Sequence, residues 1–267
     1  MLIARKVLLS AALVLGSALA ASAADLGGTS LKDAPVMEAM PAASAGWYAR
    51  VDGGYNWFMS PSVSFGDPEM FTRGTKETGA WSVGGGIGRY FGSRFRGDIT
   101  VDHLFDSKTE TDSYCNCVGN FLGTTKFDVS STVVLANLYY DFNRSGRFNP
   151  YIGGGIGYAH NETSSGSFSD GTTFGGKSTN NFAAAAMAGV TWRLRGGQTT
   201  YVGGMKDEPV AISSSNALYL DFGYRFLYLG EAKTSDFFMV PADEIVSPSS
   251  KNLMTNEIRI GLRYDLN

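Results

Sequence analysis

The sequence has few charged side chains and very little cysteine or histidine. Asp, Glu, Lys and Arg make up 18% of its 267 residues, and it contains two cysteines and two histidines. The formal net charge is −3 and no basic patch is present, so we expect no nucleic-acid partner. Neither histidine belongs to a His-x-Ser arrangement or another nucleophile–base pattern. We therefore predict that the chain is not an enzyme and has no cofactor and no metal site.

Beyond Ala24 the sequence also lacks any apolar run of the roughly 20 residues that a membrane-spanning helix needs. The longest apolar run, Val7–Ala20, follows Arg5 and Lys6 and is too short for a typical span. It precedes Ala21-Ser22-Ala23, which matches a small-x-small cleavage site. These features predict a secretory signal peptide, and hence a protein that is exported.

What the chain has in abundance is glycine and aromatic residues. The 34 glycines and 13% aromatic content favour short strands and turns over helices. From Gly46 onward, segments of about ten to thirteen residues alternate apolar with polar or small side chains, with turn-rich stretches between them. The eight segments are Trp47–Phe58, Ala80–Phe91, Arg94–Phe105, Ser130–Phe142, Tyr151–His160, Phe182–Leu194, Ala217–Leu229 and Asn256–Leu266. We therefore divide the chain into a signal peptide (1–23), a flexible periplasmic lead-in (24–45) and a strand domain (46–267).

The last segment shows the alternation most clearly. Every second residue from Ile258 to Leu266 is apolar, and the opposite face carries Glu257, Arg259, Arg263 and Asp265. Alternation alone fits two folds. In a soluble β-sandwich the apolar face is the core, whereas in a membrane barrel it meets lipid and the charges line the interior.

Three observations favour the membrane barrel. The polar faces combine Arg with carboxylates, which suits buried bidentate pairs, and aromatic residues gather at strand ends, as in an interfacial girdle. Short and long connections alternate, as in outer-membrane barrels, except that the connection Arg195–Asn216 is long where a short turn is expected. We predict an all-β, eight-stranded antiparallel up-and-down transmembrane β-barrel in the outer membrane, with ten strands as the alternative. The expected interior charges are Arg50, Asp52, Arg96, Asp98, Asp102, Asp141, Asp221, Arg225, Glu257, Arg259, Arg263 and Asp265.

An eight-stranded barrel is just wide enough for side chains to fill its interior. We therefore expect Arg–carboxylate pairs to plug the lumen, and a narrow channel is the alternative. The glycines at every second position in 84–88 and 153–157 do not match a nucleotide-binding loop, because their spacing is wrong and no helix follows. We expect them to make room for long side chains inside the barrel.

The long connections contain Ser, Thr, Gly and Asn together with aromatics that we expect to be exposed. These connections are candidates for recognition, and a variable surface cover with no fixed ligand is the alternative. Cys115 and Cys117 lie in one of them, where an oxidising compartment permits a disulfide, although two free thiols remain an alternative. The aromatics are Phe65, Phe71, Phe121, Phe168, Phe174, Phe237 and Phe238.

Five short stretches resemble the small OmpA-like and opacity-type outer-membrane barrels, a family often described as porin-like. They are Ala24–Gly28, Trp47-Tyr48, Pro150–Tyr158, Asp221–Phe226 and Gly261–Tyr264. The resemblance implies that the chain end carries the signal read by the barrel-assembly machinery, with Arg259, Gly261, Tyr264 and Leu266 in the signal positions and Asn267 in place of the usual terminal aromatic residue.

From the pattern and the resemblance together we expect a structural, envelope-stabilising role with surface interaction, and a narrow porin-like channel is the alternative. The expected partners are outer-membrane lipid and lipopolysaccharide, the barrel-assembly machinery, and a host or surface ligand of the long connections.

Overall fold

The structure is a computed structural model that describes the strand domain with several gaps. The described residues are 46–59, 62–65, 69–92, 94–116, 121–144, 146–196, 199–202, 210–213, 216–239, 244–246 and 248–266. The predicted signal peptide (1–23) and lead-in (24–45) lie outside them. Within the described ranges, no helix has the length and apolarity needed to cross a bilayer.

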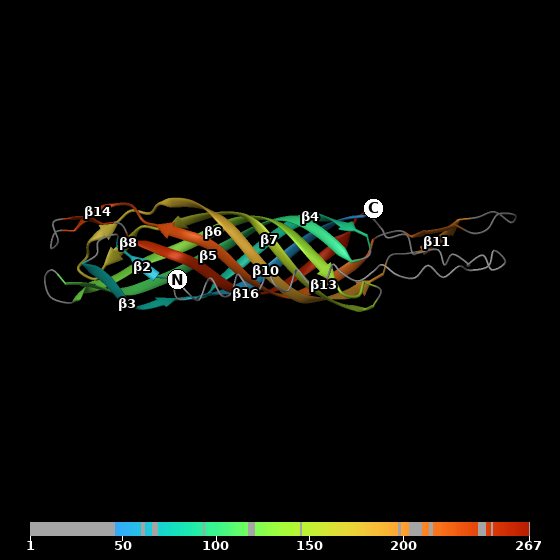
Figure 1. Cartoon of the computed structure of the whole chain (residues 1–267), viewed down its shortest axis with the longest axis horizontal. Helices are drawn as coiled ribbons and strands as arrows, with labels where there is room; N and C mark the ends of the chain where they lie inside the picture. The colour runs from blue at the N-terminus through green and yellow to red at the C-terminus, as the bar shows by residue number, and fades with distance from the viewer. Residues whose placement is uncertain are drawn as a thin grey trace, which may run out of the picture. The chain divides into compact units, whose positions relative to one another are not determined.

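Eight long strands form the main sheet (Figure 1). Each predicted segment falls on one of these strands and overruns it by no more than one residue, although several strands continue well past the predicted ends. The strands are β1 (Trp47–Met59), β4 (Ala80–Phe91), β5 (Phe95–Cys115), β6 (Phe121–Asp141), β7 (Phe148–Thr163), β10 (Ser178–Arg195), β13 (Leu218–Lys233) and β16 (Ser249–Asp265).

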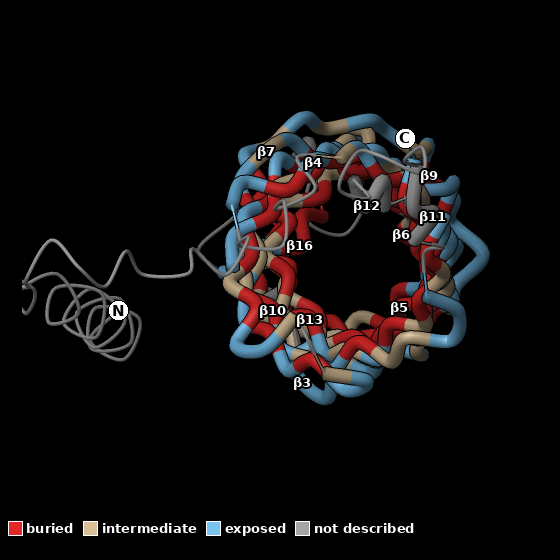
Figure 2. Tube along the Cα trace, turned by 90° about the vertical axis from the view of Figure 1, so that its right-hand side faces the viewer, coloured by how far each residue is buried: buried red, intermediate tan, exposed pale blue. Residues whose placement is uncertain are grey.

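These strands close into a ring (Figure 2), in which each pairs antiparallel with its neighbours and β16 returns to β1. A path that steps from each residue to its directly paired neighbour starts at Asp141 on β6, crosses every strand of the ring and returns to β6 at Ser131. The two residues are ten positions apart, and this separation is the stagger of the barrel. Such a stagger requires the strands to tilt by about 35–45° from the barrel axis. The closed ring confirms the predicted eight-stranded up-and-down topology.

Short strands occupy the long connections. β2 (Ser62–Ser64) pairs with β16, β3 (Met70–Glu77) with β5, and β8 (Gly166–Phe168) with both β6 and β9 (Thr173–Phe174). We call these four strands, together with residues 107–115 of β5 and 121–129 of β6, the outer tier. A separate hairpin joins β14 (Phe237–Met239) to β15 (Glu244–Val246).

The long connection between β10 and β13 contains a hairpin of its own. Its strands, β11 (Thr199–Val202) and β12 (Val210–Ser213), pair with each other, and the described pairings attach neither of them to the ring. The extra hairpin that this connection allows is therefore present, but it does not widen the barrel to ten strands.

Exposure follows the inverted arrangement of a membrane barrel. The outward side chains of Val51, Ile99 and Ile258 are at least 60% exposed, whereas the inward Arg96 and Arg225 are fully buried. Outward-facing aromatics mark both ends of the apolar belt, as at Trp47, Phe91, Phe95 and Phe148 at one end and Trp57, Trp81, Phe105 and Phe182 at the other. Apolar residues outside and charges inside are the pattern of a barrel whose solvent is lipid.

Ile99 tests this orientation, because it faces outward near the middle of the belt on β5. Ile99→Arg would place a cation in hydrocarbon, and we expect it to lower the free energy of unfolding from vesicles by about 2–4 kcal/mol. Ile99→Ala is the matched control and should cost less, since it stays apolar. Equal stability of the Arg and Ala variants in a urea titration would contradict a lipid-facing position.

Candidate functional site: the filled lumen

The lumen is the main cluster of chemically active side chains in the described structure. All twelve charges expected in the interior lie on inward positions and are buried, none of them more than 6% exposed. They come from β1, β5, β6, β13 and β16, which the ring closure brings around one axis. Carboxylates and guanidinium groups alternate in space and form networks.

The central network is built around Arg225. Its Nη1 lies 2.8 Å from Asp102 Oδ2 and its Nε lies 2.6 Å from Glu257 Oε2. Arg259 Nη2 reaches Asp52 Oδ2 at 3.0 Å and Asp102 Oδ1 at 3.4 Å. The hydroxyl of Ser82 donates to the remaining oxygen of Glu257 at 2.6 Å. Five strands of the ring are therefore cross-linked through the lumen.

Arg50 extends this network toward the short-connection end. Its Nε and Nη2 donate to Asp52 at 2.8 and 2.6 Å, while its Nη1 donates to Asp98 at 3.2 Å and to the Tyr139 hydroxyl at 3.1 Å. Asp98 also accepts a hydrogen bond from Tyr48 at 3.0 Å. Because each carboxylate has several donors, the buried charges compensate one another.

The last group of charges lies where the strands end in short turns. Arg96 Nε is 3.1 Å from Asp141 Oδ1, and its guanidinium carbon is 4.0 Å from the centre of the Tyr139 ring. Arg263 Nε is 3.4 Å from Asp221 Oδ2. The Tyr90 hydroxyl donates to Asp265 at 2.7 Å. Tyrosines therefore share the small volume with the ion pairs at this end.

Glycines make room for interior side chains, as predicted for those at 84–88 and 153–157, and Gly261 does the same. A Cβ at Gly84 would collide with the Asp102 carboxylate, and one at Gly261 would collide with that of Asp52. At Gly155 it would collide with Asn137. The glycine-rich strands are therefore the complement of the long interior side chains opposite them.

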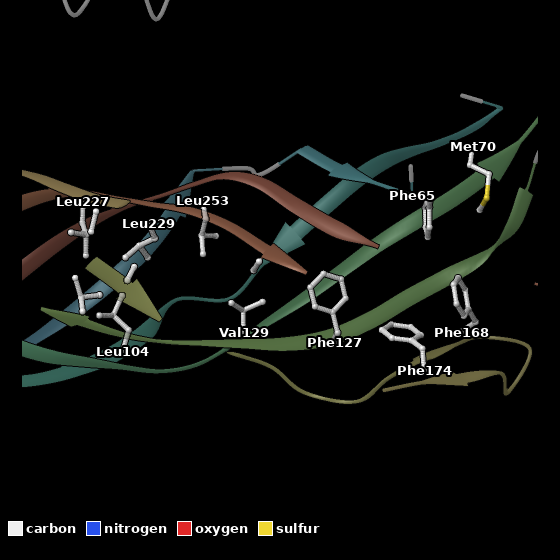
Figure 3. Packing of buried hydrophobic residues seen from close by; sticks show 14 of the residues in the cluster. Phe65, Met70, Leu104, Phe127, Val129, Phe168, Phe174, Leu227, Leu229 and Leu253 are labelled. Carbon is white, nitrogen blue, oxygen red and sulfur yellow. The ribbon is translucent and has the colours of Figure 1, made fainter. Parts of the chain in front are cut away.

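A layer of buried leucines, which was not predicted from the sequence, adjoins the charged network toward the long connections. Figure 3 shows four of them, Leu104, Leu227, Leu229 and Leu253. The leucines of this layer are fully buried and come from four strands of the ring. Each lies on the inward parity of its strand. Four of them lie beyond the interior charges on the long-connection side, as Leu227 lies two residues after Arg225, whereas Leu135 pairs with Thr100 beside the charged network. The inward position of these leucines could therefore have been recognised from the alternation in the sequence. The leucine layer comprises Leu104, Leu135, Leu227, Leu229 and Leu253.

The outer tier has an apolar core of its own that continues from the leucine layer. Phe65, Phe168 and Phe174, which we expected to be exposed recognition residues, are only 2%, 6% and 4% exposed and pack with Phe127 and Met70 in this core. The expectation was wrong because β2, β8 and β9 fold the long connections back over the lumen.

The remaining aromatics of the long connections do not belong to this buried core. Phe121 is 57% exposed, as expected, and Phe71 is partly buried where it stacks on Tyr114 at 5.4 Å between ring centres. The side chains of Phe237 and Phe238 lie outside the described residues.

The cysteines and histidines lie apart from the lumen charges. Cys115 is buried beside the outer-tier core and is disulfide-bonded, while Cys117 lies outside the described residues. On the outer wall, His103 Nδ1 lies 3.0 Å from the Thr132 hydroxyl, and His160 lies between Asn180 and Glu162. Among the described residues, no group of three or more His, Cys, Asp or Glu side chains is placed to hold a metal ion.

The residues matching the assembly signal divide between the two faces of β16. Arg259 is buried in the lumen and Gly261 faces it, whereas Tyr264 and Leu266 are 43% and 38% exposed on the lipid side. Reading of these residues by the assembly machinery stays a prediction.

Comparison with known proteins agrees with this geometry. The family model described as outer membrane protein beta-barrel domain matches residues 9–265, so the chain belongs to this family. A protein of Brucella suis biovar 1 is 30% identical over 242 residues, which cover 78% of this chain and 75% of that protein, and a Brucella melitensis protein matches equally. The resemblance to small outer-membrane barrels is thereby confirmed. The protein is located in the cell outer membrane of a Gram-negative bacterium.

Two solved structures of outer-membrane proteins also match the chain. The Neisserial surface protein A is 16% identical, with a TM-score of 0.43 and coverage of 83% of this chain and 97% of that one. OprG of Pseudomonas aeruginosa is also 16% identical, with a TM-score of 0.46 and coverage of 84% and 97%.

The buried network predicts a large asymmetry between interior and surface ion pairs. Arg225→Met would leave Asp102 and Glu257 short of a partner, and we expect a loss of about 3–5 kcal/mol in the free energy of unfolding. Lys126→Met, which removes the exposed 2.9 Å pair with Glu110, should cost no more than about 1 kcal/mol. Similar losses for both variants would show that the lumen charges are solvated.

Glu77 predicts a pH dependence of the outer tier. Burial raises the pKa of its carboxyl to about 7, since only the Thr109 hydroxyl bonds it and Oε2 has no described partner. A raised pKa means that the folded tier favours the protonated acid, so its stability should fall by roughly 1–3 kcal/mol as pH rises from about 5 to 8.

Amide exchange of β3, corrected for the intrinsic rate at each pH, measures this effect. Exchange should accelerate with pH in the native chain and be independent of pH in Glu77→Gln. A native chain whose corrected exchange does not change between these pH values would rule out a buried acid at this position.

Proposed function

We propose that this protein is a structural barrel of the outer membrane with a closed lumen, and that it stabilises the envelope and presents the outer tier to the surroundings. The observation that carries the proposal is the buried ion-pair network linking five strands of the ring. Salt-bridged side chains from opposite walls occupy the volume that a solute path would need. An eight-stranded ring leaves little space beyond them.

The leucine layer supports the same conclusion independently. Its members are fully buried, and all except Leu135 lie beyond the charged network along the lumen. An apolar constriction excludes water and ions even where the pore is not sterically blocked. The lumen therefore has two barriers of opposite chemistry.

The outer tier supports the surface-interaction part of the proposal. Its wall carries opposite charges directly across from one another on β3, β5 and β6, as in the register pairs Arg73 with Asp112 and Glu110 with Lys126. Cross-strand pairs of this kind stabilise sheets that stand free of other support. A rigid wall with the exposed Phe121 at its end is suited to contact lipopolysaccharide or another surface ligand, and we propose no enzymatic activity.

The alternative function is a narrow channel for small solutes. It is favoured by the polar inner half of the lumen, where guanidinium nitrogens of Arg96 and Arg263 have no described hydrogen-bond partner and could be bonded by water.

Planar-bilayer conductance of the purified protein separates the two functions. We expect no steady openings from the native protein or from Arg225→Met, since the leucine layer remains in place when the charge is lost. In the Arg225→Met background, Leu135→Ser combined with Leu227→Ser should add brief openings, because both the charged barrier and the leucine layer are then weakened. Steady openings of the native protein that change size in Arg259→Ala would favour the channel and contradict the closed lumen.

A further inference from the structure

Among the residues that the structure describes, the exposed charges at the short-connection end of the barrel are all positive. Among the described residues there, Arg89, Arg94, Arg147 and Arg195 are exposed. The carboxylates of the same end, Asp141, Asp221 and Asp265, are all buried in the lumen. We call the four exposed arginines the arginine collar.

The opposite end has a different composition. On the outward wall of the outer tier, Lys76, Lys108 and Lys126 face carboxylates such as Glu110 and Asp128 across the strands. No ion pair with a described carboxylate involves a member of the arginine collar, while Lys126 forms one. Carboxylates in the described part of the chain therefore do not account for the collar.

Three collar arginines stack on the aromatic girdle at the edge of the apolar belt. The guanidinium carbon of Arg89 lies 5.9 Å from the Trp47 ring centre, and that of Arg147 lies 5.6 Å from the Trp192 ring centre. Arg94 lies 6.0 Å from the ring centre of Tyr140 and donates to its hydroxyl at 2.7 Å. Stacking fixes a guanidinium plane while leaving N–H groups on its edge available for an oxyanion.

The position of Arg89 shows which surroundings the available guanidinium N–H groups face. It lies on the outward face of β4 between Ile87 and Phe91, which are 58% and 53% exposed on the lipid side. A side chain at the end of an apolar belt touches lipid headgroups. In outer-membrane barrels the short turns face the periplasm, so the leaflet concerned is the periplasmic one.

We propose that the arginine collar binds the phosphate headgroups of anionic phospholipids in the periplasmic leaflet. Each guanidinium, held on its aromatic ring, pairs with phosphate oxygens of an adjacent lipid. A polybasic surface gains roughly fivefold in partitioning to anionic lipid for each Lys or Arg near the headgroups. The lipid is recognised by charge at the edge of the belt, so the binding weakens as salt rises.

Tryptophan quenching by brominated lipid tests the proposal at the collar itself. The chain has four tryptophans, and in Trp57→Phe/Trp81→Phe only Trp47 and Trp192 remain, both beside collar arginines. The full chain is reconstituted in phosphatidylcholine vesicles with increasing brominated phosphatidylglycerol or brominated phosphatidylcholine. The ratio of the two lipid-binding constants is then measured in low and high salt, with folding verified by heat-modifiable gel mobility.

We expect phosphatidylglycerol to bind at least about fivefold more tightly than phosphatidylcholine in low salt. The preference should disappear when Arg89, Arg94 and Arg147 are all replaced by Gln. It should persist in the matched control in which Lys76, Lys108 and Lys126 are replaced by Gln, because these lie on the outer tier. Equal binding of the two lipids by the chain with its collar intact would overturn the proposal.

Two further outcomes also contradict it. A preference for phosphatidylglycerol that survives loss of the three arginines would assign the effect to other residues. Sedimentation of the full chain with purified peptidoglycan, lost in the collar variant and accompanied by no lipid preference, would identify a periplasmic polymer as the occupant instead.

Discussion

The structure depends on the requirement that every backbone N–H and C=O group within the hydrocarbon be hydrogen-bonded. A sheet meets this requirement only by closing on itself, because an edge strand would leave a row of unpaired groups in lipid. Closure is completed by the pairing of β16 with β1 and of β5 with β6. Once the ring is closed, alternate side chains must point into one small interior, and the rest must face lipid.

This geometry explains why the lumen has both charges and glycines. Eight strands with a stagger of ten residues enclose a volume that side chains fill, so each long residue needs a small one opposite it. Asp102 lies over Gly84 and Asp52 over Gly261 for this reason. Buried charges contribute little net stability, but loss of one partner is costly. We therefore expect the network to contribute more to the choice of pairing partners and register than to stability.

The sequence predicted the part of the fold that lies within the membrane, because lipid imposes a strict period of two. In Ile258–Leu266 the pattern could be read directly, and the structure has the same faces. The predicted segment ended at Phe105, so the part of β5 that belongs to the outer tier was missed, for two reasons. A register shift between Leu104 and Ser107 changes which parity faces inward, and above the belt the outward face carries Lys108 and Glu110 instead of apolar residues. A search for alternating apolar residues detects neither the change of parity nor a strand whose outward face is polar.

The aromatics of the long connections could not be predicted for a related reason. Phe65, Phe168 and Phe174 lie in segments with turn-like composition, and their burial depends on β2 pairing with β16 and β8 with β6 across large sequence separations. Local composition carries no information about such pairs. The leucine layer was more accessible, because Leu104 and Leu227 continue the inward parity of Asp102 and Arg225.

The closed lumen that we propose leaves the two ends and the lipid-facing wall as the surfaces available for function. These surfaces differ in a way that the fold does not require. The outer tier balances its charges strand by strand, whereas the exposed charges described at the opposite end are all arginine. A wall of paired charges is neutralised by its own carboxylates, whereas the described part of the chain supplies no carboxylate partner to the arginine collar. The proposed headgroup binding would match the barrel to a different environment on each side of the same apolar belt.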